Sequence, residues 1–331
     1  MASAHMSLRR FSACTLILLI LSGAATLSAQ QPSAVPPPPP DAQAPPPPPP
    51  PPPYNDALFA RPVPPPPLAF LTQTAGMPSG RLYGDRRFHA ILHAYVPRCT
   101  FHYGRDMSIT DALSLVIPGS RVPVQVQDNR YVVLSGHRGP YLNGRAFLWI
   151  DTQNGIFLGA FYFHPTNGEP TPTLAVFSRQ LQTQEKVIES TQLPPVFMAD
   201  LSQWQADNYL PPLVTRYFLT GTNDRILLEH AEDYCAPQSG DPAPPSMCEQ
   251  MNATAADLDM NAAYYLEQVD YATNATAWMI TGADQQAWLT WEQNSCAAAA
   301  DQLACRIRLT RSRTWVIIRR RPIPHIAHPA L

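Results

Sequence analysis

The chain has 331 residues, and 23 lysines and arginines against 25 aspartates and glutamates give a net charge of −2 at pH 7. This balance argues against a nucleic-acid-binding protein, which needs a basic face. Only the N-terminal region holds a long apolar run, which excludes a membrane protein with several spans. Twenty of the 39 prolines lie between Pro32 and Pro67, and the rest of the chain suffices for one large or two ordinary domains.

The N-terminus has the pattern of a secretory signal peptide. Arg9 and Arg10 precede an apolar run at 15–21, and small residues follow as far as Ala29. We therefore expect residues 1–29 to be an export signal and the mature protein to be periplasmic or secreted. The alternative is an uncleaved segment that holds the protein to the inner membrane.

Residues 30–67 are expected to form a proline-rich, disordered spacer. The nine consecutive prolines at 45–53 fix φ and lack N–H donors, so that run can adopt only the polyproline II conformation. A functional interpretation is a stalk that holds the following domain away from a membrane. The alternative is a spacer that remains after signal removal and has no further role.

Residues 68–232 predict an α+β domain, with an antiparallel sheet of about five strands and flanking helices. Helices are expected at 108–116 and 201–209. The expected strands lie at 122–126, 131–135, 146–151, 156–163 and 173–178.

Residues 233–318 predict a small, disulfide-bonded, all-α domain, and residues 319–331 a basic tail. We expect one helix up to about residue 266, a break near Thr281, a second helix from Gln285 and a third from Cys305. In an oxidising compartment the four cysteines of this region would form disulfides, for which three connectivities exist. Closeness in sequence favours the pairs Cys235–Cys248 and Cys296–Cys305. Cys99 is then expected to be a buried thiol.

The run at 122–135 leads into a loop and then into segments at 146–151 and 155–160, and this arrangement resembles the Ivy family of periplasmic lysozyme inhibitors. The resemblance spans about residues 120–180. In that family a disulfide-closed loop, Cys-Lys-Pro-His-Asp-Cys, plugs the lysozyme cleft. The corresponding loop at 136–142 reads Gly-His-Arg-Gly-Pro-Tyr-Leu, without either cysteine.

Three residues of this loop are the candidate partner-binding residues: His137, Arg138 and Tyr141. A glycosidase cleft presents two carboxyl groups a few ångströms apart, and arginine forms bidentate, charge-assisted hydrogen bonds with carboxylates. The alternative is an exposed hairpin loop whose side chains are only solvated.

The C-terminal region holds a series of motif residues in a fixed order. They are Cys248, Leu258, Asp259, Met260, Asn261, Tyr264, Gln285, Trp288, Leu289, Cys296, Cys305, Leu309, Thr310 and Arg313. The series resembles the LprI-type lysozyme-inhibitor domain over about residues 235–318. Gln286 and Glu292 depart from that pattern, because the family tends to carry arginine there. Tyr264 and Trp288 are expected to pack in the core.

A metal site would be the main alternative chemistry. His89, His93, Cys99 and His102 fall within fourteen residues, and the first two share a helical face. Pro97 breaks the segment, however, and no glutamate lies between the histidines as a zincin would need. Because no hydrolase, phosphate-loop or dinucleotide motif is present either, we expect a protein that is not an enzyme and that has no metal and no cofactor.

Charge is unevenly distributed along the chain. From Arg306 onward there are seven arginines and no acidic residue, whereas between Ala29 and Cys305 14 basic residues oppose 25 acidic ones. An acidic body steers towards a cationic partner such as a lysozyme, and the basic tail could contact an anionic envelope surface.

The resemblances imply an exported envelope protein that binds and inhibits a lysozyme or confers lysozyme tolerance. The alternative is an envelope-tethered structural or interaction protein without inhibitory activity.

Overall fold

The computed structural model describes residues 58–62, 66–138, 144–183, 185–222, 224–236 and 244–321. The predicted signal peptide, most of the proline-rich spacer and most of the basic tail lie outside these ranges. Within them no helix is both long enough and apolar enough to cross a membrane.

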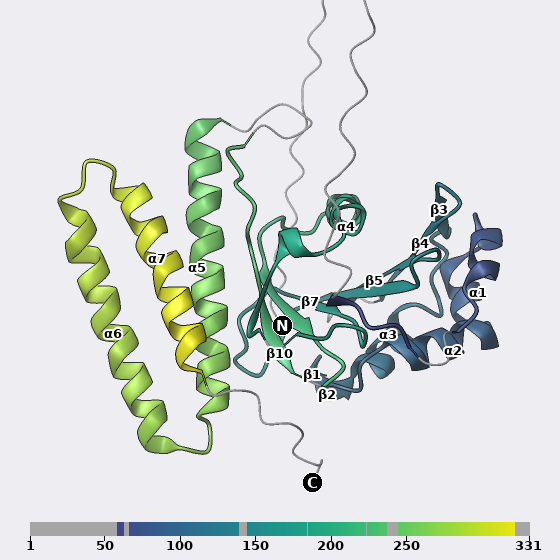
Figure 1. The fold of residues 1–331 in the computed structure, drawn as a ribbon, viewed down its shortest axis with the longest axis horizontal. Helices are drawn as coiled ribbons and strands as arrows, with labels where there is room; N and C mark the ends of the chain where they lie inside the picture. The colour runs from purple at the N-terminus through teal and green to yellow at the C-terminus, as the bar shows by residue number, and fades with distance from the viewer. Residues whose placement is uncertain are drawn as a thin grey trace, which may run out of the picture. The chain divides into compact units, whose positions relative to one another are not determined.

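The centre of the fold is an eight-stranded mixed sheet with the strand order β3-β4-β5-β6-β7-β9-β10-β8 (Figure 1). Its strands are β3 (Gln125–Gln127), β4 (Tyr131–Arg138), β5 (Gly144–Asp151), β6 (Ile156–Phe163), β7 (Thr173–Phe177), β8 (Val187–Glu189), β9 (Thr215–Leu219) and β10 (Arg225–Glu229). Neighbours are antiparallel except for the parallel pairs β7/β9 and β8/β10. The α+β class is therefore confirmed.

The sheet is larger than expected from the sequence. All five expected strands are present as β3 to β7, but β8, β9 and β10 extend the sheet beyond them. These three strands are short. Arg216 interrupts the apolar run of β9, and Arg225 and Glu229 stand at the two ends of β10. Arg216 and Arg225 are tolerated there because each forms an ion pair, with Glu232 at 2.9 Å and with Glu169 at 3.0 Å.

Helices cover both faces of the sheet. Alternate residues of a strand point to opposite faces, so Leu148 packs towards α1 (Ser79–Tyr83), α2 (Arg86–Tyr95) and α3 (Ile109–Val116). Phe147 and Trp149 pack on the other face against Phe197 and Trp204 of α4 (Pro195–Asp207). A small antiparallel sheet of β1 (Thr100–His102) and β2 (Asp106–Ser108) precedes α3, and 3₁₀ helices lie at Ala69–Thr74 and Ser190–Gln192.

The two helices expected in the α+β region are both found, with different bounds for the second. Ser108 caps α3, since its side chain accepts a hydrogen bond from the N–H of Asp111 at 3.1 Å. Helix α4 begins at Pro195, six residues before the expected start, because proline is tolerated in the first turn of a helix. It ends at Asp207, and Tyr209 beyond it is exposed with a positive φ of 55°.

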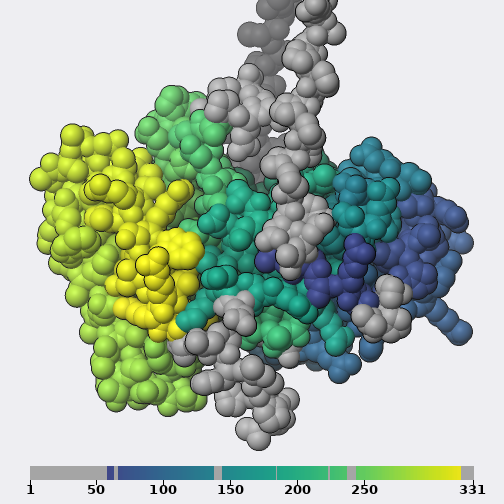
Figure 2. Space-filling view, viewed as in Figure 1, coloured from purple at the N-terminus to yellow at the C-terminus, as the bar shows by residue number. Residues whose placement is uncertain are grey.

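Three long helices form the C-terminal region: α5 (Pro245–Asp270), α6 (Ala275–Ala297) and α7 (Gln302–Arg320). Leu266 of α5 and Ile317 of α7 pack with Tyr217 and Leu227 of the sheet. In Figure 2 the yellow surface of the C-terminal end of the described chain lies against teal and green surface of the preceding regions.

The expected helix break near Thr281 is wrong. Helix α6 runs without a break from Ala275 to Ala297, and it begins at Ala275 because the Asn274 side chain caps it by accepting a hydrogen bond from the N–H of Ala277.

The expectations for the cysteines are confirmed. Disulfides join Cys235 to Cys248 and Cys296 to Cys305, and Cys99 is free and buried. The second disulfide closes the turn between α6 and α7. Burial raises the pKa of Cys99 to about 12, so its thiol stays protonated at neutral pH. Disulfides of this kind are typical of proteins in oxidising compartments.

Candidate functional site

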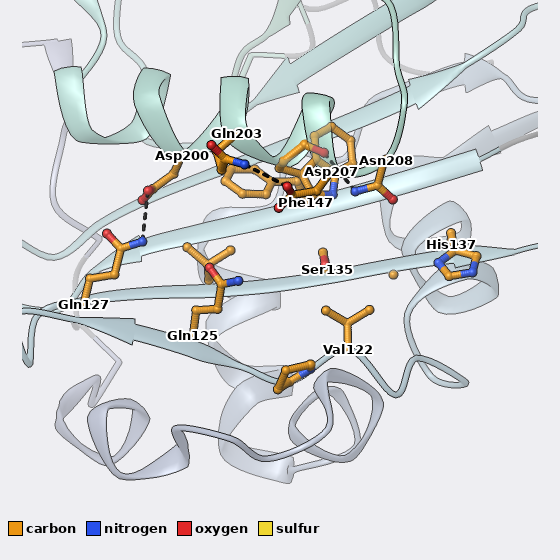
Figure 3. A pocket seen from close by; sticks show the side chains of 14 residues that line it. Val122, Gln125, Gln127, Ser135, His137, Phe147, Asp200, Gln203, Asp207 and Asn208 are labelled. Carbon is orange, nitrogen blue, oxygen red and sulfur yellow. Dashed lines mark hydrogen bonds between the residues drawn. The ribbon is translucent and has the colours of Figure 1, made fainter. Parts of the chain in front are cut away.

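A groove of about 330 Å³ lies between α4 and the β3–β4 edge of the sheet (Figure 3). Strand periodicity points Val133, Ser135 and His137 of β4 to the same face, which is the face that α4 covers. Polar residues on one side of α4 form the facing wall, and those that line the groove are Asp200, Gln203, Asp207 and Asn208. The groove therefore has a strand floor, a polar helical wall and an edge strand, β3, on its other side.

Asp200 occupies one end of the groove and is the best-positioned polar side chain in it. Its Oδ2 accepts a hydrogen bond from Nε1 of Trp149 at 2.9 Å, and its Oδ1 accepts one from Nε2 of Gln127 at 3.0 Å. Burial raises the pKa of Asp200 above its usual range, although both hydrogen bonds act in the opposite direction. In the described part of the chain no lysine or arginine nitrogen lies within 4 Å of this carboxylate.

The opposite end of the groove is formed by His137. Figure 3 shows Gln127 and Asp200 near one end and His137 at the other. Between them lie Gln203 and Asp207, whose side chains are joined by a hydrogen bond of 2.7 Å. The groove thus links a half-buried carboxylate to an exposed imidazole.

The structure places the three expected partner-binding residues at or beyond the end of β4. His137 is exposed and faces Arg145 across the β4–β5 ladder. Arg138 is the last residue of β4, and Tyr141 lies outside the described residues. The strand that leads into the loop is tightly packed at Gly136, where an added Cβ would lie 2.8 Å from the carbonyl oxygen of Val116. His137 therefore projects from a rigid stem.

Sequence reasoning missed the polar wall of the groove. Asp200, Gln203 and Asp207 lie at i, i+3 and i+7 of α4, so they share a face beside the buried Leu201 and Trp204. That spacing is visible in the sequence. The sequence does not show that this face lines a groove, because only the fold brings it opposite β3 and β4.

The residues of the metal hypothesis do not form a metal centre. His89 and His93 are exposed on α2, and Cys99 is buried. His102 is hydrogen-bonded through Nδ1 to Asp106 at 2.9 Å and through Nε2 to Thr166 at 3.0 Å. Among the residues with described positions, no three His, Cys, Asp or Glu side chains are close enough together to hold a metal ion.

A second polar centre joins the sheet to α5. Asp259 accepts a hydrogen bond from the backbone N–H of His230 at 2.9 Å, and its other oxygen lies 2.6 Å from Nδ1 of that histidine. Arg216 pairs with Glu232 through two hydrogen bonds of 2.9 and 3.0 Å. His230 and Arg216 are buried, so this centre fixes α5 to the sheet and is not an open binding site.

Several of the C-terminal motif residues pack between the helices. Nε of Arg313 donates to Oε1 of Gln285 at 2.9 Å, and its guanidinium lies 5.6 Å from the ring centroid of Trp288. Tyr264 and Trp288 are partly buried against the cluster that joins these helices to the sheet. Glu292, one of the two departures from the motif, is buried and accepts a hydrogen bond from Arg306 at 3.1 Å. These contacts give the motif residues a role in helix packing.

Comparison of the chain with protein-family models, with curated proteins and with solved structures finds no match.

Proposed function

We propose that the protein is an exported, non-catalytic binding protein of the cell envelope that inhibits a lysozyme or a related peptidoglycan hydrolase. The loop after β4 would enter the enzyme cleft, where His137 and Arg138 would hydrogen-bond the paired carboxyl groups, and Tyr141 would pack beside them. Within the basic tail, Arg320 and Arg321 form ion pairs with Glu267 and Asp270, so the exposed Arg319 would be the residue that contacts an anionic envelope surface. The predicted signal peptide supports a location of this activity in the periplasm or outside the cell.

The observation that carries this proposal is the exposed His137 at the end of a close-packed strand, beside the open groove. A protruding residue on a rigid stem loses little conformational freedom on binding, which favours affinity. The two disulfides agree with an oxidising compartment. The resemblances of the sequence to the Ivy and LprI types point to the same partner.

The test is a titration of lysozymes with purified residues 30–331. The rate of cell-wall lysis is the measured quantity, at low and at moderate salt. We expect saturable inhibition that weakens with salt and that is lost in the double variant His137→Ala/Arg138→Ala. The matched control is His93→Ala/Arg98→Ala, which removes the same two side-chain types from exposed positions near α2. Failure to inhibit chicken-type, goose-type and invertebrate-type enzymes alike would refute the proposal.

A further inference from the structure

The groove beside α4 has a floor of mixed character and an acidic end. Val133 and Phe147 contribute hydrocarbon to the lining between His137 and Asp200, and Ser135 lies beside them. At the end of this floor, both oxygens of Asp200 are held in place by Trp149 and Gln127. The carboxylate is thus oriented before any ligand arrives.

Two carboxylates, Asp200 at this end and Asp207 further along the groove, carry its negative charge. The two groups that donate hydrogen bonds to Asp200 in the described part of the chain, an indole and an amide, are neutral, so neither balances its charge. Asp207, two turns further along α4, is bonded only to the neutral amide of Gln203 among the described residues. A half-buried carboxylate that has neutral donors but no counter-charge is stabilised by an incoming cation.

Lysine and arginine side chains have the complementary form. Each has an apolar stem that packs along hydrocarbon and a cationic head that reaches a polar partner. The carboxylates of Asp200 and Asp207 favour the approach of a cationic side chain to this groove. The charge and the shape of the groove therefore favour the same occupant, a long cationic side chain.

We propose that the groove receives a lysine or arginine side chain of a basic protein partner, with the stem on Val133 and the cationic head at Asp200. This inference rests on the proposed function, because the partner would be the lysozyme held by the β4 loop. It adds a second contact, in which the inhibitor accepts a basic side chain from the surface around the enzyme cleft. The groove and the loop would then act together, because His137 borders both.

The first experiment needs no lysozyme. Nα-acetylarginine amide is added to ¹⁵N-labelled protein, and the indole N–H signal of Trp149 is followed by NMR, because that group is bonded directly to Asp200. We expect a saturable shift of this signal that the isosteric, neutral citrulline derivative does not produce. A Trp149 signal that stays unchanged, or that responds equally to both compounds, would overturn the inference.

The second experiment uses lysozyme and the variant Asp200→Asn. Asparagine can still accept from Trp149, and its amide can donate to Gln127 once the Gln127 amide turns over, so the fold should be retained. We expect affinity for lysozyme to fall about tenfold, as for a charged contact that becomes neutral. Asp128→Asn is the control, because it removes one exposed carboxylate from the β3–β4 turn, and asparagine tolerates the positive φ of 51° there.

The two proposals can fail separately. If arginine amide shifts the Trp149 signal but no lysozyme binds, the groove binds cations and the proposed function is wrong. If lysozyme binds with equal affinity to the wild type, Asp200→Asn and Asp128→Asn, the proposed function stands and the groove inference is wrong.

Discussion

The indole of Trp149 donates its N–H to Oδ2 of Asp200 at 2.9 Å, and this bond joins the central strand β5 to helix α4. Trp149 is 1 % exposed, so its polar atom needs a partner, and the carboxylate supplies it. The same bond orients Asp200 along the groove. One interaction therefore serves both the packing of α4 and the geometry of the candidate site.

Replacing Trp149 with phenylalanine tests this relationship. The ring would still pack near Phe197, but Asp200 would lose one of its two donors. We expect the free energy of unfolding to fall by about 1–3 kcal/mol in urea denaturation, since a half-buried carboxylate loses a partner and the ring is smaller. Tyr131→Phe, which keeps the ring that stacks on Trp149, is the control and should cost less. Equal losses in the two variants would show that the indole bond contributes nothing.

Glu229 should make stability depend on pH. Burial, and after it the charges of Asp259 and Glu189, raise the pKa of this carboxyl from 4.5 to about 7, while Arg311 acts weakly in the opposite direction. The folded protein therefore holds this proton more tightly than the unfolded chain. The contribution of protonated Glu229 to the free energy of unfolding is present in full below about pH 4.5 and is lost as the pH rises through about 7.

Glu229→Gln should remove this loss. Urea denaturation at several pH values measures the free energy of unfolding of both proteins. Above pH 7 we expect the value for the variant to exceed that of the wild type by at most about 3 kcal/mol, and at lower pH we expect the two values to converge. Glu249→Gln, at an exposed position of α5, controls for the removal of one acidic residue. A variant whose advantage does not grow with pH would contradict the assignment.

Gly136 should be required for the stem of the β4 loop. A Cβ at this position would lie 2.8 Å from the oxygen of Val116 and 2.9 Å from Cα of Ile117, both of which are backbone atoms. We expect Gly136→Ala to lower the free energy of unfolding by about 1–3 kcal/mol through overpacking. Lysozyme inhibition should weaken as well, because β4 must shift next to His137.

Gly119→Ala is the matched control for Gly136→Ala. An added Cβ at Gly119 meets no atom within 4 Å, so stability and inhibition should both stay close to those of the wild type. If Gly136→Ala is as stable and active as Gly119→Ala, strand β4 has more freedom than its packing implies.

The disulfide between Cys296 and Cys305 should stabilise the α6–α7 turn. It closes a short loop, since its cysteines are nine positions apart, and such a crosslink contributes about 2–3 kcal/mol in the chain-entropy description. Cys296→Ala/Cys305→Ala should therefore lower the midpoint of urea unfolding under oxidising conditions. The difference from the wild type should vanish when both proteins are fully reduced, and a difference that persisted would mean that the cysteines act through packing.

The sequence by itself determines the local elements whose signals are short-range. Short apolar or alternating runs between turn residues predict β3 to β7, Ser108 marks the start of α3, and the close spacing of the cysteines predicts both disulfides. These features follow from neighbouring residues and from the periodicity of strands and helices, so they can be recognised without the fold.

Only the tertiary structure decides the remaining strands and the groove. Strands β9 and β10 carry Arg216 and Arg225, which fit in a sheet because Glu232 and Glu169, distant in sequence from their partners, pair with them. Asp200 likewise acquires its position from Trp149 and Gln127, which lie 51 and 73 residues away. A buried arginine is stabilised by its acidic partner, and a carboxyl pKa is raised by the groups that bury it. The fold brings these neighbours together from distant parts of the chain, and no local pattern encodes them.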